Sequence, residues 1–197
     1  NKKHLFWIIP TVLILIFISS IYGFNNSAVT KLEQVKTSLS NVESSYQRRS
    51  DVISGLVNTV KGVANFEQEV LTEVVQARAS AGQTTIDLSN LNSSNINEFT
   101  QAQQALSGAL SRLLVTVERY PELKATQNFL EFQSQLEGTE NRINVERNRY
   151  NEAINTYNTH IKIFPNAIYA QWLGFGEEFE RFTSSEGSQN APEIDFN

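Results

Sequence analysis

The sequence contains no cysteine and no methionine, and it has only two histidines and four prolines among 197 residues. Without cysteine the chain has no disulfide, no thiol nucleophile and no thiolate metal ligand. Neither His4 nor His160 has a second histidine three or four residues away, the spacing of a helical zinc site. The net charge of −5 gives no reason to expect nucleic acid as a partner. We therefore expect no metal or other cofactor.

One uncharged run stands out, LFWIIPTVLILIFISSIYGF, from Leu5 to Phe24. A helix needs about 20 mainly apolar residues to cross a hydrocarbon core of about 30 Å. Trp7 and Tyr22 lie near the two ends of the run, where aromatic rings favour the membrane interface. Pro10 lies near its start, where a proline disturbs a helix least. The sequence predicts a transmembrane helix over this run, preceded by a short N-terminal end.

A cleaved signal peptide is the alternative to a retained anchor. It would need small residues at a cleavage site after the apolar run, and the residues at that point, Ile21 to Phe24, fit poorly. Lys2 and Lys3 directly precede the run, so the positive-inside rule favours an exported domain on the extracytoplasmic side. Basic residues also follow the run, at Lys31 and Lys36, and the opposite orientation therefore stays open.

Beyond the apolar run, hydrophobic residues recur every three or four positions, which is typical of helices with one buried face. The first soluble helix is expected to continue from the membrane span. A second is expected to end near Gly82 and a polar loop to occupy residues 83–101. A third helix stops before Pro121, and a fourth, about forty residues long, stops before Pro165. Short connections between long helices favour an antiparallel bundle over residues 25–182, followed by a polar tail over 183–197. The predicted fold class is all-α.

The stretch SYQRRSDVISGLV places Arg48, Arg49 and Asp51 within an apolar rhythm. Paired guanidinium groups could bind an anion, and an aspartate could act as a base. The simpler interpretation is a corner of the bundle, in which Asp51 caps a new helix and both arginines lie off the buried face. The arginines would then pair with glutamates such as Glu140 or Glu146. Because the apolar phase continues unchanged to Val60, a single kinked helix explains the pattern almost equally well.

Several segments together resemble the LemA family of membrane-anchored bacterial helical proteins: NNSAVTKLEQVK, VESSYQRRSDVISGLVNTVKGVANFE, LTEVVQARA, ERYPELKATQNFLEFQSQLEGTENRI, ERNRYNEAINTYN and FPNAIYAQWLGF. The resemblance covers nearly the whole chain and implies a helical bundle behind an N-terminal transmembrane helix. It also implies a place in the bacterial inner membrane, and it carries over no catalytic residues. The family usually has a proline in the segment ISGLV, where this sequence has Ser54.

The segment FPNAIYAQWLGFGEEFERF is the most aromatic part of the chain outside the apolar run. It can close the open end of the bundle, or form an exposed patch that meets another subunit or the membrane surface. Acidic residues nearby disfavour anionic lipid, which makes a protein the favoured partner. The residues of this possible interaction patch are Phe164, Tyr169, Trp172, Phe175 and Phe179.

Three functions are compatible with these features. The favoured one is a non-catalytic scaffold of the cell envelope, anchored in the lipid bilayer through its N-terminal helix. Such a scaffold would associate with copies of itself and could bind other envelope proteins. The second is a ligand-sensing bundle that passes a signal to a membrane partner. The third is an enzyme that uses Arg48, Arg49 and Asp51.

Overall fold

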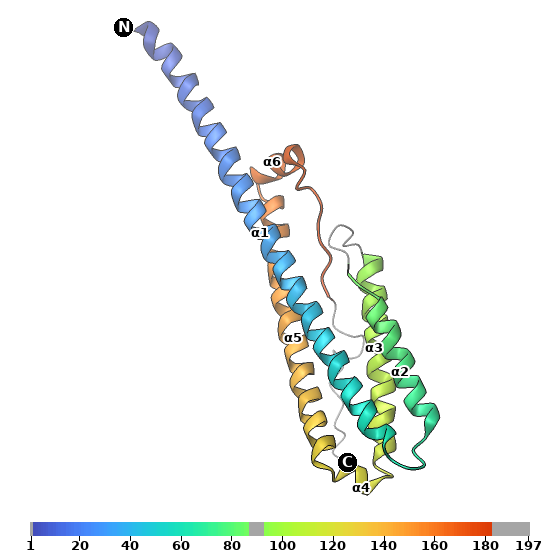
Figure 1. Cartoon of the computed structure of the whole chain (residues 1–197). Coiled ribbons are helices and arrows are strands. Elements are labelled where there is room, and N and C mark those ends of the chain that lie inside the picture. Colours follow the sequence, from blue (N-terminus) through green and yellow to red (C-terminus); the bar gives the residue numbers. More distant parts are fainter. Residues whose placement is uncertain (1, 87–92, 183–197) are drawn as a thin grey trace, which may run out of the picture.

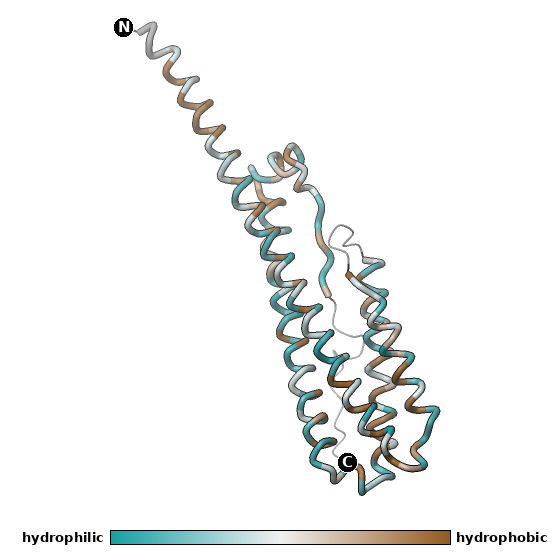
Figure 2. Tube along the Cα trace, viewed as in Figure 1, coloured by the Kyte–Doolittle hydropathy of each residue, from teal (hydrophilic) through white to brown (hydrophobic). Residues whose placement is uncertain are grey.

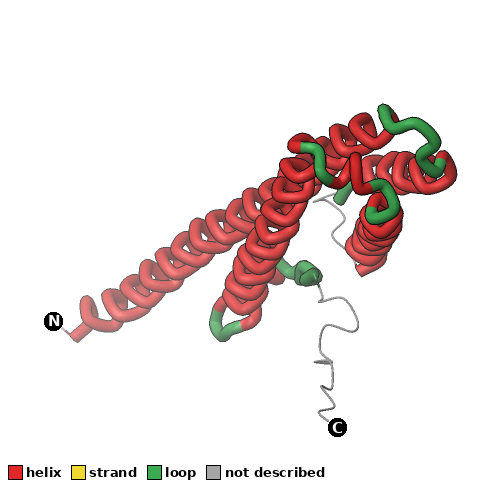
Figure 3. Tube along the Cα trace, turned by 90° about the horizontal axis from the view of Figure 1, so that it is seen from below, coloured by secondary structure: helices red, strands yellow, loops and turns green. Residues whose placement is uncertain are grey.

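The computed structural model of the chain describes residues 2–86 and 93–182, and all regular elements in these ranges are helices (Figures 1 and 3). The predicted all-α fold is confirmed, while the predicted tail over residues 183–197 lies outside the described residues. Figure 1 shows two antiparallel pairs, α1 with α5 and α2 with α3, and α1 extends well beyond the others. The helices are α1 (Lys2–Lys61), α2 (Gln68–Gln83), α3 (Ser93–Val117), α4 (Pro121–Lys124), α5 (Gln127–Lys162) and α6 (Asn166–Leu173).

The first helix is continuous through Arg48 and Asp51, so the predicted corner there is wrong. Asp51 does not cap a helix; its Oδ1 accepts a hydrogen bond of 3.1 Å from the side-chain amide of Gln47, one turn earlier. The Ser54 hydroxyl donates to the Ser50 carbonyl at 3.0 Å, which is a usual arrangement inside a helix. The alternative of one helix of more than fifty residues is the one observed.

Gly55 in the same region is a point of close contact between helices. A Cβ built on Gly55 would lie 2.5 Å from Cε1 of Phe132 on α5. A side chain at this position would therefore collide with the Phe132 ring. Glycine is explained here by the approach of α5 and not by a weak point in the backbone.

The first real break follows Lys61, within the segment predicted to be one helix ending near Gly82. Asn65 has a φ of 62°, in the left-handed region that asparagine tolerates better than most residues. The Tyr120 hydroxyl donates to the Asn65 carbonyl at 3.0 Å and holds the turn against the end of α3. Gly82 lies inside α2 and does not cap it; α2 ends at Gln83, before Thr84 in an extended conformation.

The predicted breaks at the two later prolines are confirmed. Pro121 occupies the first position of α4, and Pro165 directly precedes α6. The predicted fourth helix is divided, because α5 begins only at Gln127. Thr126 caps it by accepting a hydrogen bond of 3.3 Å from the Phe129 amide.

Two clusters of buried apolar residues hold the bundle together. One joins the last third of α1, including Leu56 and Val60, to α2, α3 and the start of α5. The other lies between the middle of α1 and the second half of α5, around Tyr150 and Ile154. The start of α1 lies outside both, and its apolar side chains from Trp7 to Ile18 are largely exposed. Figure 2 shows this hydrophobic segment projecting from the bundle.

The projecting segment is the predicted transmembrane helix. Its most hydrophobic window has a mean hydropathy of 2.1, and it is long and apolar enough to cross a bilayer. It is the one such segment within the described part of the chain. The apolar segment of α1 is therefore a candidate membrane span, continuous with the bundle.

Candidate functional site

Arg49 lies at the centre of a hydrogen-bond network that joins three helices. Its side chain is only 3% exposed, which corrects the prediction that both arginines lie off the buried face. Nη1 donates to Oε1 of Glu140 on α5 at 2.7 Å and to the Ser107 hydroxyl on α3 at 3.2 Å. Nη2 donates to the backbone carbonyl and to Oε1 of Gln103, at 3.1 and 2.8 Å. The predicted pairing with Glu140 is confirmed for Arg49.

The same guanidinium also lies over the Tyr46 ring, with Cζ 5.4 Å from the ring centre. Burial raises the pKa of Tyr46, and the cationic Arg147 and Arg49 oppose that rise. The phenol therefore stays protonated at neutral pH. Nη1 and Nη2 of Arg49 thus donate to groups of its own chain.

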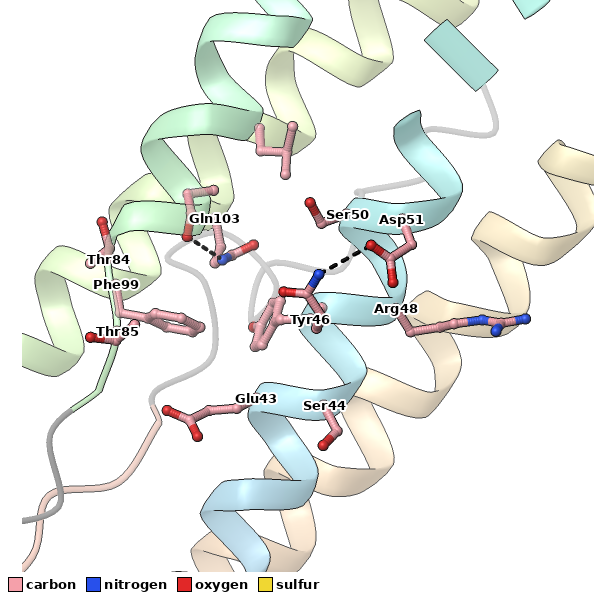
Figure 4. A pocket seen from close by; sticks show the side chains of 14 residues that line it. Glu43, Ser44, Tyr46, Arg48, Ser50, Asp51, Thr84, Thr85, Phe99 and Gln103 are labelled. Carbon is pink, nitrogen blue, oxygen red and sulfur yellow. Dashed lines mark hydrogen bonds between the residues drawn. The ribbon is translucent and has the colours of Figure 1, made fainter. Parts of the chain in front are cut away.

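Arg48 and Asp51 do not meet Arg49 at a common point. Both side chains are exposed on the other side of α1, and Asp51 is bonded to Gln47. Figure 4 shows Arg48 extending away from Tyr46 and Phe99. The other glutamate suggested as a partner, Glu146, is bonded to Arg149 at 2.8 Å instead. A catalytic group made of Arg48, Arg49 and Asp51 is therefore not assembled.

A cleft of about 550 Å³ opens beside this part of α1 (Figure 4). The end of α2 and the start of α3 form its other walls, and the rings of Tyr46 and Phe99 meet edge to face at 4.9 Å. Glu43 lies at one side; burial raises the pKa of its carboxyl, and a hydrogen bond with the Ile86 backbone lowers it in part. The lining is Glu43, Ser44, Tyr46, Gln47, Arg48, Ser50, Asp51, Ala81, Gly82, Thr84, Thr85, Phe99, Gln103 and Leu106.

The cleft combines two aromatic rings with hydroxyl and carboxyl groups. This lining is better suited to binding a small polar molecule than to catalysing a reaction. Its hydroxyls, such as Thr85, have no histidine or cysteine beside them in the lining to act as base or nucleophile. Within residues 2–86 and 93–182, no three His, Asp or Glu side chains come together as a metal site. The chemistry that this arrangement supports is binding.

A second feature held by specific hydrogen bonds is the segment after α6, residues 174–182, which we call the strap. Gly174, with a φ of 80°, ends α6, and the chain then runs in an extended form along the bundle (Figure 1). The side chain of Asn158 on α5 accepts from the Phe179 amide at 3.2 Å and donates to the Phe179 carbonyl at 3.0 Å. Asn151 makes the same pair of bonds with Phe182, at 3.0 and 2.9 Å.

Between these two asparagines, Asn155 accepts a hydrogen bond of 2.9 Å from Arg181. The strap rings pack inward: Phe179 lies 5.2 Å from Tyr157, and Phe182 lies 5.1 Å from Tyr150. The side-chain amides thus replace the neighbouring strand that an extended segment usually requires, and the rings complete the second core cluster.

The sequence interpretation missed the strap, because it considered this aromatic segment only as a closure of the bundle or as an exposed patch. A signal was present in the spacing of Asn151, Asn155 and Asn158. Residues four and three apart lie on one face of a helix, so these amides form a row on α5. The row alone, however, does not indicate which segment of the chain it binds.

The predicted interaction patch is divided by the structure. Tyr169 is buried against α1, and Phe175 and Phe179 pack partly against the core. Phe164 and Trp172, in contrast, are 84% and 68% exposed. The aromatic segment thus both closes the bundle and leaves exposed rings beside the candidate span.

Comparison with known proteins decides the family. The LemA family model matches residues 38–196, which include the Arg49 network, the cleft and the asparagine row. The chain belongs to the LemA family. The family motif ERNRYNEAINTYN occupies α5 from Glu146 to Asn158, and it supplies all three asparagines of that row.

The relatives include proteins of two kinds. Protein LemA of Metamycoplasma hominis is 24% identical over 172 residues, which cover 87% of this chain and 75% of that protein. Magnetosome protein MamQ 2 of Paramagnetospirillum magneticum is 27% identical over 190 residues, covering 87% of this chain and 70% of the relative. Magnetosome protein MamQ of Magnetospirillum gryphiswaldense is 26% identical over 178 residues, covering 81% and 65%.

Proposed function

We propose that this LemA-family protein is a non-catalytic, membrane-anchored scaffold of the bacterial cell envelope that associates with copies of itself. The observation that carries the proposal is the continuity of α1, which passes without a break from the apolar segment to Lys61. One helix therefore serves both as anchor and as the main support of the bundle. The side chains most suggestive of chemistry, around Arg49, are used to join α1, α3 and α5.

The exposed side of α1 near the anchor supports self-association. Val29 is 42% exposed and lies in a shallow groove whose lining also includes Thr30, Gln34 and Ser38. The charged residue of this lining, Glu33, is paired with Lys36 at 2.7 Å. Side chains of this kind pack and form hydrogen bonds between helices. A second copy that contacts this face would also be held in the same membrane plane, which raises its local concentration.

The test is the mass of the full chain in detergent, measured by light scattering over a wide range of protein concentration. We expect a concentration-dependent rise from monomer to oligomer, abolished by Val29→Arg and unchanged by Val115→Arg. Val115 is also exposed, at 70%, but lies in the last turn of α3. A strictly monomeric chain at every concentration would refute self-association and leave the anchor untouched.

A separate experiment tests the anchor. Membranes that contain the full chain are washed with alkaline carbonate, which removes peripheral proteins but leaves membrane-spanning ones. We expect the protein to remain in the membrane pellet. Its release into the wash would contradict the membrane-spanning role of residues 5–24.

The cleft favours a second function, the sensing of a small ligand. Its volume of about 550 Å³ is within the range of small-molecule sites, and Glu43 would face a hydroxyl or amine of the ligand. Binding would raise the thermal stability of the full chain, and above the Kd this rise would follow the logarithm of the ligand concentration. Substitution of Tyr46→Ala should remove that rise while Asp51→Asn, at the margin of the cleft, should keep it. If no compound in a broad metabolite set raises stability, ligand sensing is excluded for that set.

A further inference from the structure

The short helix α6 is apolar on both sides, but the bundle covers only one of them. Tyr169 and Ala170 face inward and are buried. The helix sequence, NAIYAQWL, contains no charged residue. A helix that is hydrophobic all round is normally covered all round. The exposed apolar residues of α6 and of the segment before it form what we call the α6 patch: Ile163, Phe164, Ile168, Trp172 and Leu173.

Tyr169 determines where this helix lies along α1. The Ser20 hydroxyl donates to the Tyr169 hydroxyl at 3.4 Å. The Tyr169 ring lies 5.9 Å from the Phe17 ring and 5.8 Å from the Phe24 ring. All three contacts belong to the last two turns of the apolar segment, and seven residues of helix span about 10 Å. Figure 1 shows α6 beside α1 at the point where α1 leaves the bundle.

The contacts made by Tyr169 place the α6 patch at a definite depth in the bilayer. Because the proposed function puts residues 5–24 across the membrane, the last 10 Å or so of that run lie in the outer third of the hydrocarbon core, next to the headgroups. Trp172 follows Tyr169 by three positions on α6, so the contacts of Tyr169 bring Trp172 near the level that tryptophan prefers. We propose that the α6 patch is embedded in the leaflet on the bundle side of the same membrane that α1 crosses. This inference rests on the proposed anchor.

The charges near α6 support attachment by hydrophobic burial and not by attraction to anionic lipid. Lys162, at the end of α5, is paired with Glu178 of the strap at 2.6 Å. The cation closest in sequence to the patch is therefore already neutralised within the chain. We therefore expect the α6 patch to embed in zwitterionic vesicles as well as in anionic ones, and its embedding to depend little on salt concentration. The acidic residues of the strap thus do not argue against lipid as the occupant.

Two separate attachments have a consequence that a single anchor lacks. A bundle held only by α1 can tilt toward the membrane in any direction. With α6 also held at the membrane surface, the end of α5 is fixed beside the exit of α1. The bundle then presents the same side to the membrane and to its neighbours in every copy.

The two tryptophans of the sequence allow each attachment to be measured by itself. The full chain is reconstituted in phosphatidylcholine vesicles whose acyl chains carry bromine, a quencher of tryptophan fluorescence, near the headgroup or near the chain ends. The variant Trp7→Phe leaves Trp172 as the only reporter, and Trp172→Phe leaves Trp7. A control combines both substitutions with Val115→Trp, which reports from the end of α3 distant from α6 in Figure 1.

We expect bromine near the headgroup to lower Trp172 emission about twofold, and bromine near the chain ends to lower it less. The Val115→Trp control should be unaffected. If Trp7 is quenched and Trp172 is not, the proposal is overturned while the anchor stands; iodide protection of Trp172 in that case would indicate a protein occupant. If Trp7 is not quenched either, the anchor and the inference fall together.

Discussion

Nη1 of Arg49 lies 2.7 Å from Oε1 of Glu140, and this contact joins α1 to α5 from within the core. The arginine is buried, whereas the glutamate side chain is 45% exposed. The two partners are therefore not equivalent. Glu140 can regain water when it loses its partner, but the buried Gln103 side chain beside Arg49 cannot.

Substitution of Arg49→Ala should lower the free energy of unfolding by about 3 kcal/mol, because it removes the buried cation that the buried Gln103 side chain and Glu140 bind. Arg49→Lys should recover only part of this loss, since one ammonium cannot reproduce the guanidinium fork. Thermal unfolding of the full chain in detergent, followed by circular dichroism, measures both. The matched control is Arg48→Ala on the exposed face, which should change stability by less than about 0.5 kcal/mol. Equal effects at the two positions would contradict the structural role of Arg49.

Substitution of Gly55→Ala should destabilise the chain by about 1 kcal/mol, since the new methyl group collides with the Phe132 ring. Gly108→Ala is the control, because nothing lies within 4 Å of a Cβ at that position of α3. It should stabilise the chain by roughly 0.5–1 kcal/mol through helix propensity. In a Phe132→Ala background the cost of Gly55→Ala should disappear, which a double-mutant cycle measures. A cost that persists there would refute the collision.

The asparagine row makes a prediction about two particular backbone amides. Asn158→Ala should increase hydrogen exchange at the Phe179 amide, and Asn151→Ala should do so at the Phe182 amide. Each lost bond is expected to cost about 1 kcal/mol. Asn148→Ala, an exposed asparagine on the same helix, should leave exchange at both amides unchanged. Loss of protection in the control as well would mean that the strap is held by something other than the row.

His160 should titrate below its usual range. Burial lowers its pKa first, and the charge of Lys31 lowers it further, against a raising hydrogen bond with the Phe24 backbone. The ring stacks on Phe24 at 5.2 Å in its neutral form. Its contribution to stability is thus fully present above pH 6.5, the unfolded value, and is lost as pH falls through the lower folded pKa.

NMR titration of the imidazole signals checks this, with His160→Gln to assign the resonance. Between about pH 6.5 and pH 5, the free energy of unfolding should fall less in the His160→Gln variant than in the unsubstituted chain. An imidazole of His160 that titrates at or above 6.5 would contradict the prediction.

The sequence was sufficient for the fold class and for breaks that carry a proline. Pro121 and Pro165 end helices for a local reason, the missing amide and the restricted backbone, so they can be recognised without the structure. The break after Lys61 has no such local cause. It depends on Asn65 adopting a left-handed conformation and on a hydrogen bond from Tyr120, fifty-five positions later. The corner predicted at Asp51 rested instead on the suitability of aspartate as a helix cap, although the apolar periodicity continued through it without a shift.

The candidate site was harder to predict than the fold for a related reason. Arg49 was expected off the buried face, and its burial depends on acceptors from α3 and α5 that only tertiary structure brings together. The strap is a similar case. The asparagines and the phenylalanine amides that they bind are separated by about twenty to thirty residues, and side-chain to backbone bonds of that span leave no periodic pattern.

The unbroken course of α1 has a mechanical consequence. From Thr11 to Lys61 each turn is bonded to the next, over about 75 Å at 1.5 Å per residue. A rod of this kind transmits torsion: if the exposed apolar segment is turned about the long axis of α1, the distant end of the bundle must rotate through nearly the same angle. Rotation of either end of α1 would thus rotate the other end as well.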